Sequence, residues 1–255
     1  MLSIVIPVLN EEKYLPLLLE GIKKQNFNEG EESELSSSAS LSSDESSAYE
    51  IIVADAGSTD RTIEIAKNFG CRVVKGGLPA KGRNEGVKIA QGDTLLFMDA
   101  DNLLPENFLK DLLEEFKKRN LSVASFPIFP KGNWIDKLVY TMYNFWVNLI
   151  QKFSALATNS VLVRKEIFEK IGGFDEEIKI AEDHDFAKRA AKIGKFGFIK
   201  TKPVLTSPRR FEKDGRLKTY LKYILVGIHM FFLGPVKKDI FQYQFDYSKK
   251  NKKEI

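Results

Sequence analysis

The sequence predicts an α/β domain in which a mainly parallel sheet is flanked by helices. Strand-like and helix-like segments alternate along the first half of the chain, which is the pattern of successive βαβ units. Several strand-like segments end in polar or acidic residues, at the position where open α/β sheets bind their ligands. The chain has 255 residues, 43% of them hydrophobic, which is enough for one large domain with a full core.

The predicted elements follow one another in a regular order. Short apolar runs predict strands at residues 2–7, 50–54, 72–75, 94–98 and 122–126. Apolar residues at helical spacing predict helices at residues 12–25, 58–69, 81–90, 106–119, 134–153 and 181–195. A last apolar run at 220–234 contains Lys222 and His229 and is shorter than the roughly 18 residues that a membrane-spanning helix needs.

Residues 28–48 are rich in Ser and Glu and contain almost no large apolar residue. Such a segment buries too little surface to offset the entropy lost on ordering, so we expect it to be disordered. The single cysteine, Cys71, excludes an intramolecular disulfide, fits a reducing compartment and is expected in the core. The apolar N-terminus has no preceding basic region, so we expect no signal peptide and a cytoplasmic protein.

The net charge of +4 conceals an asymmetry along the chain. Residues 1–186 carry 21 Lys/Arg against 30 Asp/Glu, a net −9, whereas residues 187–255 carry 18 against 5, a net +13. Such a basic part suits an anionic membrane surface or a phosphorylated ligand, and it suits a solvated surface equally well. The helix at 134–153 has an apolar stripe that predicts a core position or an interface with a second subunit, with contact at a membrane surface as the alternative.

Two carboxylates, Asp99 and Asp101, directly follow the buried run at 95–98. Two like charges this close repel each other unless a positive group lies beside them. A divalent cation bound through oxygen ligands is one explanation of the pair. Capping of the following helix by Asp101 is the other.

Polar residues also follow the first two predicted strands. Pro7 removes a backbone donor near the end of the first strand, and Asn10 and Glu11 offer polar groups at the turn after it. Asp55, in "VADAGSTDRT", stands at the end of the second strand. Its carboxylate could accept hydrogen bonds from a nucleobase, or it could cap the turn.

The segment "KGGLPAKGRNEG" brings Lys81 and Arg83 to a helix N-terminus, where cationic side chains and free N–H groups suit a diphosphate. Its glycine spacing imitates a P-loop, but Arg83-Asn84 replaces the Lys-Ser/Thr pair that binds phosphate and Mg²⁺. We therefore exclude an ATPase. The absence of G-x-G-x-x-G after the first strand also removes the main support for a dinucleotide oxidoreductase.

The segment "AEDHDFAKRAAKIGK" begins with three acids, Glu182, Asp183 and Asp185. The helix dipole favours acids at a helix start and explains two of them. A surplus of carboxylates in an expected cleft indicates acid–base chemistry. His184 and His229 are the only histidines, and we assign neither as a metal ligand.

In this order, the segments "SIVIPVLNE", "DAGSTD", "KGRNEG", "DAD", "GGFDE" and "AEDHDF" resemble the inverting nucleotide-sugar glycosyltransferases of family 2, which have the GT-A fold. The resemblance extends from residue 2 to about residue 210. It implies one Rossmann-like GT-A domain with a mixed, mainly parallel sheet at 1–210. A basic and apolar helical extension is then expected at 211–255.

The resemblance also implies a donor, a cofactor and a site. The donor is a nucleotide-diphospho-sugar, and Asp99 and Asp101 hold Mn²⁺ or Mg²⁺ on its diphosphate. Asp183 is implied as the general base, and Glu182 as the residue that orients the acceptor or the base. Arg209 and Arg210 could close over the diphosphate or form a solvated basic turn. The donor-binding residues implied are Pro7, Val8, Asn10, Glu11, Asp55, Lys81, Arg83, Asp99, Ala100, Asp101, Arg209 and Arg210.

The acceptor expected from this resemblance is a saccharide or a lipid-linked molecule. A polyprenyl phosphate acceptor, already ionised near neutral pH, would need no general base. Two other classes stay open: a nucleotidyltransferase, which usually has a Gly-rich basic turn where this chain has Asn10-Glu11-Glu12, and a non-catalytic nucleotide-sugar-binding subunit. We expect no nucleic-acid partner. A homo-oligomer and contact with the inner face of the membrane are both left open.

Overall fold

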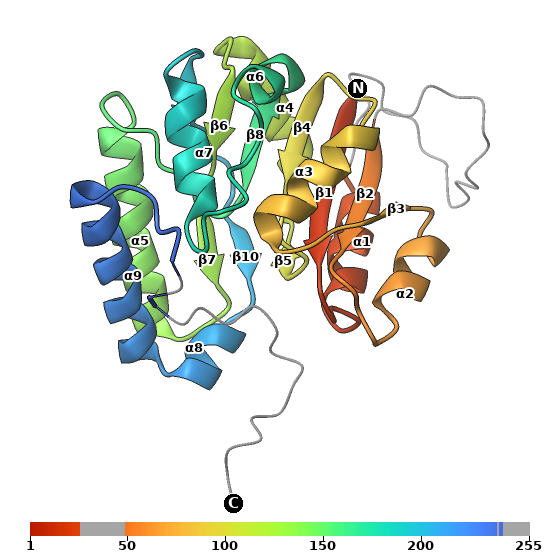
Figure 1. Cartoon of the computed structure of the whole chain (residues 1–255), viewed down its shortest axis with the longest axis horizontal. Coiled ribbons are helices and arrows are strands. Elements are labelled where there is room, and N and C mark those ends of the chain that lie inside the picture. The colour runs from red at the N-terminus through yellow and green to blue at the C-terminus, as the bar shows by residue number, and fades with distance from the viewer. Residues whose placement is uncertain (26–48, 239, 242–255) are drawn as a thin grey trace, which may run out of the picture.

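The computed structural model describes residues 1–25, 49–238 and 240–241 and confirms the predicted α/β architecture (Figure 1). Helices lie on both faces of a seven-stranded mixed sheet, with strand order β3-β2-β1-β4-β8-β6-β9. Only β8 runs antiparallel to its neighbours in this sheet. The strands are β1 (Leu2–Val8), β2 (Tyr49–Asp55), β3 (Arg72–Lys75), β4 (Thr94–Phe97), β6 (Val123–Ser125), β8 (Val161–Arg164) and β9 (Phe196–Phe198). The segment 28–48, predicted to be disordered, lies outside the described residues.

The register of β1, β2 and β4 aligns the ends of these three strands. β1 pairs in parallel with β2 on one side, where Val8 lies opposite Asp55, and with β4 on the other, where Val5 lies opposite Phe97. The carboxyl ends of the three strands therefore meet at one edge of the sheet. The loops that follow them carry the polar motifs of the sequence.

Two hydrophobic cores cover the two faces of the sheet. Ile4 and Ile6 of β1 pack in one core with α1, α2 and α4, whereas Val5 points to the other core with α3, α6 and α7. This alternation follows from the two-residue period of a strand. The predicted core residue Cys71 is buried in the first core. The helices are α1 (Leu15–Lys23), α2 (Thr62–Asn68), α3 (Pro79–Ile89), α4 (Phe108–Lys118), α6 (Lys165–Lys170) and α7 (Glu182–Ala191).

A second, three-stranded sheet and three further helices complete the described chain. β10 pairs antiparallel with β5 and parallel with β7. In Figure 1, α5 and α9 lie at one side of the molecule and α8 lies below them. These elements are β5 (Asn102–Leu103), β7 (Ile128–Pro130), β10 (Val204–Thr206), α5 (Trp134–Ile150), α8 (Arg209–Asp214) and α9 (Arg216–Phe232).

A buried carboxylate fixes α5 against α9. Asn133 and Asp136 form a capping box at the start of α5. The Asp136 carboxylate also accepts hydrogen bonds from Arg216 Nε at 3.1 Å and from the Tyr220 hydroxyl at 2.6 Å. Two residues of α9 thus satisfy a fully buried acid of α5.

The apolar stripe of α5 does not face the core, so the core position expected for it is wrong, while the interface with a second subunit and the contact with a membrane surface stay predictions. Trp134 is 72% exposed and Phe145 is 65% exposed, whereas Asp136 and Asn144 are buried. The inward polar groups are satisfied, since Asn144 donates to the Ile128 carbonyl at 2.9 Å. In the described part of the chain, every helix falls short of the length and hydropathy needed to cross a membrane.

Candidate functional site

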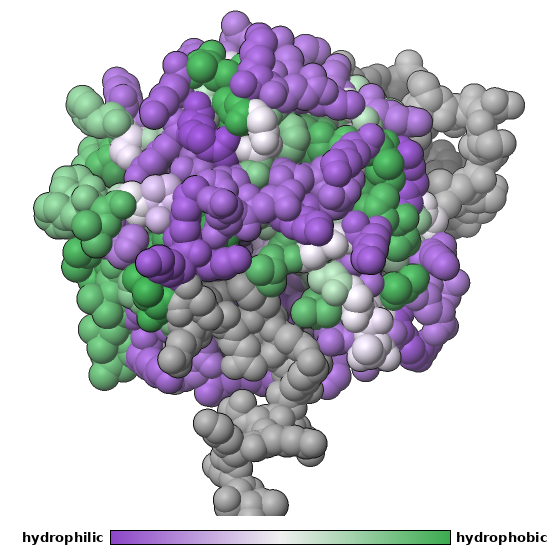
Figure 2. All heavy atoms as spheres, in the orientation of Figure 1, coloured by the Kyte–Doolittle hydropathy of each residue, from purple (hydrophilic) through white to green (hydrophobic). Residues whose placement is uncertain are grey.

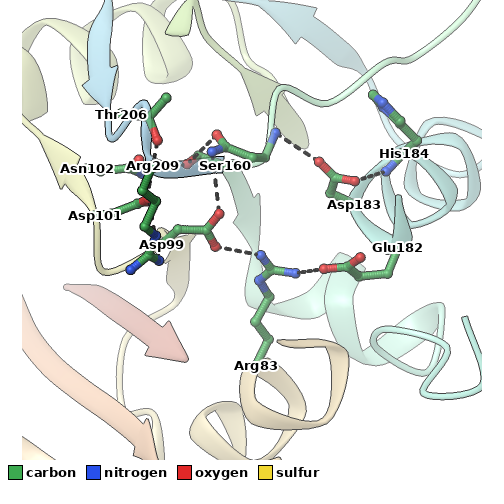
Figure 3. Close-up of polar contacts among 11 residues, drawn as sticks. Arg83, Asp99, Asp101, Asn102, Ser160, Glu182, Asp183, His184, Thr206 and Arg209 are labelled. Carbon is green, nitrogen blue, oxygen red and sulfur yellow. Dashed lines mark hydrogen bonds and ion pairs between the residues drawn. The ribbon is translucent and has the colours of Figure 1, made fainter. Parts of the chain in front are cut away.

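The carboxyl edge of the sheet gathers most of the charged residues that the sequence singled out (Figure 3). Asp99 and Asp101 follow β4, and Glu11 follows β1. Glu182 and Asp183 begin α7, which packs on the same sheet. Residues more than 170 positions apart in the sequence thereby form one polar cluster.

Arg83 is the cation at the centre of this cluster. Its side chain is only 3% exposed and stands on α3 beneath the edge of the sheet. One guanidinium nitrogen donates to Asp99 at 3.0 Å and the other to Glu182 at 2.5 Å. Its face lies 5.2 Å from the ring of Phe174. Arg83 thus joins the loop after β4 to the start of α7.

A second arginine joins the first and last parts of the site. Arg209, at the start of α8, donates to both carboxylate oxygens of Glu11, at 2.7 and 2.5 Å. The same guanidinium lies 3.5 Å from Asp101. Thr206 donates from its hydroxyl to Asp101 at 3.3 Å. Two residues that were predicted separately for the donor site, Asp101 and Arg209, are therefore brought together.

Asp183 is buried and has fixed partners. Its carboxylate accepts hydrogen bonds from the backbone N–H of Asn159 at 2.8 Å and of His184 at 2.9 Å. The Asn159 side chain also reaches Asp99, with 3.4 Å between nitrogen and oxygen. Asn159 was not singled out from the sequence, yet it joins the predicted base to the predicted metal ligand.

Burial in this cluster changes the acidity of its carboxyl groups. It raises the pKa of Asp99 and of Asp101 above the ordinary value, while the nearby arginines act in the opposite direction. Burial raises the pKa of Glu11 and of Glu182 in the same way. The arginine cations therefore compensate the buried carboxylates only partly.

These residues suit a divalent cation that takes some of its ligands from the protein and the rest from a bound diphosphate and water. The residues that the structure describes contain no group of three or more His, Cys, Asp or Glu side chains suited to a metal. Asp99 and Asp101 could supply two hard oxygen ligands, and diphosphate oxygens and waters would supply the rest. The incomplete compensation of the carboxylates by Arg83 and Arg209 favours added positive charge at this place.

Backbone strain is concentrated at the same edge. Among the described residues, five non-glycine residues have positive φ, and three of these line the site: Asn10, Asn159 and Ala181. Asparagine tolerates this left-handed conformation because its side chain can form local hydrogen bonds, whereas the methyl group of alanine can form none. Ala181 directly precedes Glu182, so the strained turn sets where α7 and its acids begin.

The loops after β1 and β2 form the neighbouring part of the edge. Asp55 accepts hydrogen bonds from the backbone N–H of Gly57 at 2.9 Å and of Ser58 at 3.1 Å, so it caps its own turn. Asn10 donates from its backbone to the Ser58 hydroxyl and accepts from Thr59 N–H at 2.8 Å. These contacts fix the two loops to each other and explain their polar residues structurally.

The remaining predicted site residues lie around the cluster. Pro7 and Val8 belong to β1, and Ala100 is buried between the two acids of the loop after β4. Lys81 is exposed near the start of α3. Arg210 donates to the Tyr223 hydroxyl at 3.2 Å. Its charge acts to lower the pKa of Asp99 and of Asp101, but the effect of burial is larger, so both pKa values are raised overall.

Solved structures share this architecture. The mannosyltransferase PcManGT from Pyrobaculum calidifontis, in complex with GDP-Man and Mn²⁺, has a TM-score of 0.66 at 18% identity, covering 87% of this chain and 61% of that chain. The fragment 1–349 of Staphylococcus aureus TarS has a TM-score of 0.61 at 22% identity, covering 91% and 72%. The fold is the GT-A fold, as the sequence predicted.

The family follows from the sequence itself. The model described as "Glycosyl transferase family 2" matches residues 3–172, and the chain belongs to this family. The resemblance seen in the sequence is thereby confirmed, and the chain carries a family 2 glycosyltransferase domain.

Two relatives illustrate the range of the family. The poly(ribitol-phosphate) beta-N-acetylglucosaminyltransferase TarS of Staphylococcus aureus is 24% identical over 204 residues, which are 74% of this chain and 32% of that protein. An uncharacterized glycosyltransferase of Haemophilus influenzae is 27% identical over 218 residues, 81% of this chain and 67% of that protein. The chain therefore spans about a third of the length of TarS.

Proposed function

We propose that this protein transfers a sugar from a nucleotide-diphospho-sugar to an acceptor hydroxyl, with inversion at the anomeric carbon. The observation that carries the proposal is that Asp99, Asp101 and Asp183 converge at one edge of the sheet, where Asn159 contacts both Asp99 and Asp183. This arrangement supports a general base that lies beside a diphosphate site. Relatives with GDP-Man and Mn²⁺ or with UDP-GlcNAc bound support the donor class.

Asp99 and Asp101 would hold Mn²⁺ or Mg²⁺ together with the donor diphosphate. When bound, the cation would neutralise charge on the diphosphate. Arg83 forms an ion pair with Asp99, and Arg209 lies within 3.5 Å of Asp101. With the carboxylates bound to the cation, both guanidinium groups would turn toward the phosphate oxygens. Arg210 and Lys81 would add positive charge from the rim of the site.

The nucleoside would lie over the loops after β1 and β2. The Asp55 carboxylate uses its oxygens on two backbone N–H groups, and its remaining lone pairs could accept from a base N–H. Pro7, Val8, Asn10 and Glu11 would line the same space. Asp55 would serve uracil, thymine or guanine in this way, so the base and the sugar are set by the shape of the cleft.

Asp183 would act as the general base. It takes the proton of the acceptor hydroxyl while that oxygen forms a bond to the anomeric carbon, and the bond from this carbon to the diphosphate oxygen breaks on the opposite side. The N–H groups of Asn159 and His184 hold the carboxylate in one orientation for this transfer. Glu182, bound to Arg83, would orient the acceptor. A hydroxyl acceptor on a saccharide, a polymer or a lipid-linked molecule suits this chemistry.

The experiment that tests this assignment compares two neighbouring acids of α7. Asp183→Asn should bind nucleotide as the wild type does, but transfer to a panel of hydroxyl acceptors should fall by about 10²–10⁴-fold, the usual contribution of a general base. Asp185→Asn is the matched control, because Asp185 pairs with Arg189 outside the cluster.

Full turnover in Asp183→Asn would contradict the role of Asp183 and would favour an acceptor that is already ionised, such as a polyprenyl phosphate. Absence of turnover in the wild type with every acceptor and donor would favour a non-catalytic binding subunit.

A further inference from the structure

The apolar side chains of α5 and α9 form one exposed surface, the α5–α9 face. In both helices they recur every three or four residues, with adjacent pairs such as Phe145 and Trp146, so they lie along one side of each helix. All are at least half exposed: Trp134, Leu138, Met142, Phe145, Trp146 and Leu149 in α5, and Leu217, Leu221, Ile224, Leu225, Ile228, Phe231 and Phe232 in α9. Figure 2 shows apolar residues gathered on the side of the molecule that these helices form.

The two helices present this face together. Asp136 of α5 is bonded to Arg216 and Tyr220 of α9, and Phe211 of α8 packs between Tyr140 and Tyr220. Polar and aromatic contacts on the inner side therefore hold both apolar stripes outward. Contiguous apolar surface of this kind marks an interaction site in a soluble fold.

The exposed charges on the two helices of the α5–α9 face are positive. In residues 131–153 and 215–238, Asp136 is the only acidic residue, and it is fully buried. Lys218 is exposed and directly follows the exposed Leu217 of α9, which places it at the margin of the apolar stripe. Lys137 and Lys152 are exposed on α5 and directly after it. The face is thus apolar at its centre and cationic around it.

We propose that the α5–α9 face docks this protein on an anionic lipid surface. An apolar helix face with Trp and Phe at its centre and lysines beside it is the arrangement of helices that lie in the interfacial layer. Anionic head groups would neutralise the lysines while the apolar side chains enter the acyl boundary. A second copy is a poorer match, because a symmetric dimer through this face would set the lysines of α5 and α9 against their copies, and neither helix has an exposed acid to pair with them.

Docking in this way brings the lipid surface close to the site. The inner side of α5 carries Tyr143, whose hydroxyl donates to the Ala157 carbonyl at 3.0 Å, two residues before the Asn159 that binds Asp183. Phe153, 92% exposed, begins this same loop. One helix, about 10–12 Å across, therefore separates lipid from the loop beside Asp183. In a step that rests on the proposed function, this position favours a lipid-linked acceptor.

The test uses vesicles and no nucleotide, so it is independent of turnover. Trp134 and Trp146 are the two tryptophans of the chain, and both lie on the α5–α9 face, so their emission reports its insertion directly. We expect the full chain to sediment with phosphatidylcholine–phosphatidylglycerol vesicles at low salt, with emission shifted to shorter wavelength. Phosphatidylcholine alone or high salt should weaken binding at least several-fold.

Variants locate the binding surface. Phe145→Glu combined with Phe231→Glu should reduce vesicle binding by at least tenfold, whereas Leu17→Glu, an exposed leucine of α1, should leave it unchanged. Asp183→Asn should bind vesicles as the wild type does, which separates this proposal from the proposed function. Melting curves check that each variant is folded.

Three results would overturn the proposal. The wild type could fail to bind anionic vesicles, or Leu17→Glu could lose binding as far as the double variant does. Light scattering could instead show a stable dimer that the double variant dissociates and that binds no vesicle, which would assign the α5–α9 face to a second copy.

Discussion

Asp101 and Glu50 are two partly buried acids whose environments shift their pKa values in opposite directions. Burial raises the pKa of Asp101, and its arginine neighbours offset this only partly. At Glu50, burial also raises the pKa, but hydrogen bonds from Ser3, from the Gln91 backbone and from Arg72 outweigh it, so the pKa is lowered overall. The two acids therefore make opposite predictions for stability.

Asp101→Asn should stabilise the protein without ligand. A carboxyl whose pKa is raised in the folded state is more costly to ionise there than in the unfolded chain, so at neutral pH its charge reduces the free energy of unfolding. We expect a gain of about 1 kcal/mol, or about 2–4 °C in Tm, measured by thermal unfolding near pH 7.5. A lower Tm would show that the bond to Thr206 and the contact with Arg209 outweigh the cost of burial.

Glu50→Gln should destabilise the protein at neutral pH. A carboxyl whose pKa is lowered by folding contributes stability above its unfolded pKa and loses it as the pH falls through the folded pKa. We expect a loss of about 1–3 kcal/mol at pH 7, shrinking as the pH falls below about 4.5, measured by denaturant unfolding at several pH values. A loss that does not change with pH would contradict an ionised, hydrogen-bonded Glu50.

At the scale of elements, α3 owes its position to glycine. Gly86 faces Val5 of β1, and a Cβ added at Gly86 would lie 2.4 Å from Val5 Cγ1. Gly82, four residues earlier, faces Pro7 at 3.1 Å. The absence of side chains lets α3 lie directly on β1, and this close approach brings Arg83 beneath the site. The "KGRNEG" motif thus has a packing role as well as a chemical one.

Gly86→Ala should therefore destabilise the fold by about 1–3 kcal/mol, because an added methyl group overfills the contact between α3 and β1. Gly227→Ala in α9 is the matched control, since a Cβ there meets nothing within 4 Å, and it should stabilise by up to about 1 kcal/mol through helix propensity. Denaturant unfolding of both variants checks the difference. Equal effects of the two substitutions would contradict the close packing of α3.

The helix α5 shows which structural features a periodic sequence pattern does not determine. Its periodic apolar residues predicted a helix that begins at Trp134, as observed, but they did not determine which side faces the protein. The buried side is selected by Asp136 and Asn144, whose partners lie in α9 and at Ile128. Such partners are distant in sequence, and periodicity contains no information about them.

At the scale of the whole molecule, the parallel βαβ part was predictable because its strands and helices alternate locally. The antiparallel β8 and the small sheet of β5, β10 and β7 were not predicted, since they are short and depend on long-range pairing. In the site, acids at strand ends could be found from the sequence. Asn159 could not, because its role depends on a left-handed backbone and on contacts with Asp99 and Asp183.

In the proposed function, Asp99 and Asp101 hold a metal together with a nucleotide diphosphate. The most direct measurement is the shift in melting temperature caused by UDP, GDP or dTDP, each with Mn²⁺ and with chelator, in the wild type, in Asp101→Asn and in Asp111→Asn. Asp111 is an exposed acid of α4 and serves as the control. Each variant is compared with its own melting temperature without ligand.

We expect one nucleotide to raise the melting temperature of the wild type and of Asp111→Asn only when Mn²⁺ is present. A ligand at about 100 times its Kd stabilises by about 2.7 kcal/mol, which is a readily measured shift. Asp101→Asn should show no such shift. If no nucleotide shifts the wild type with any metal, or if Asp101→Asn responds as the wild type does, the two acids are not the metal–diphosphate site.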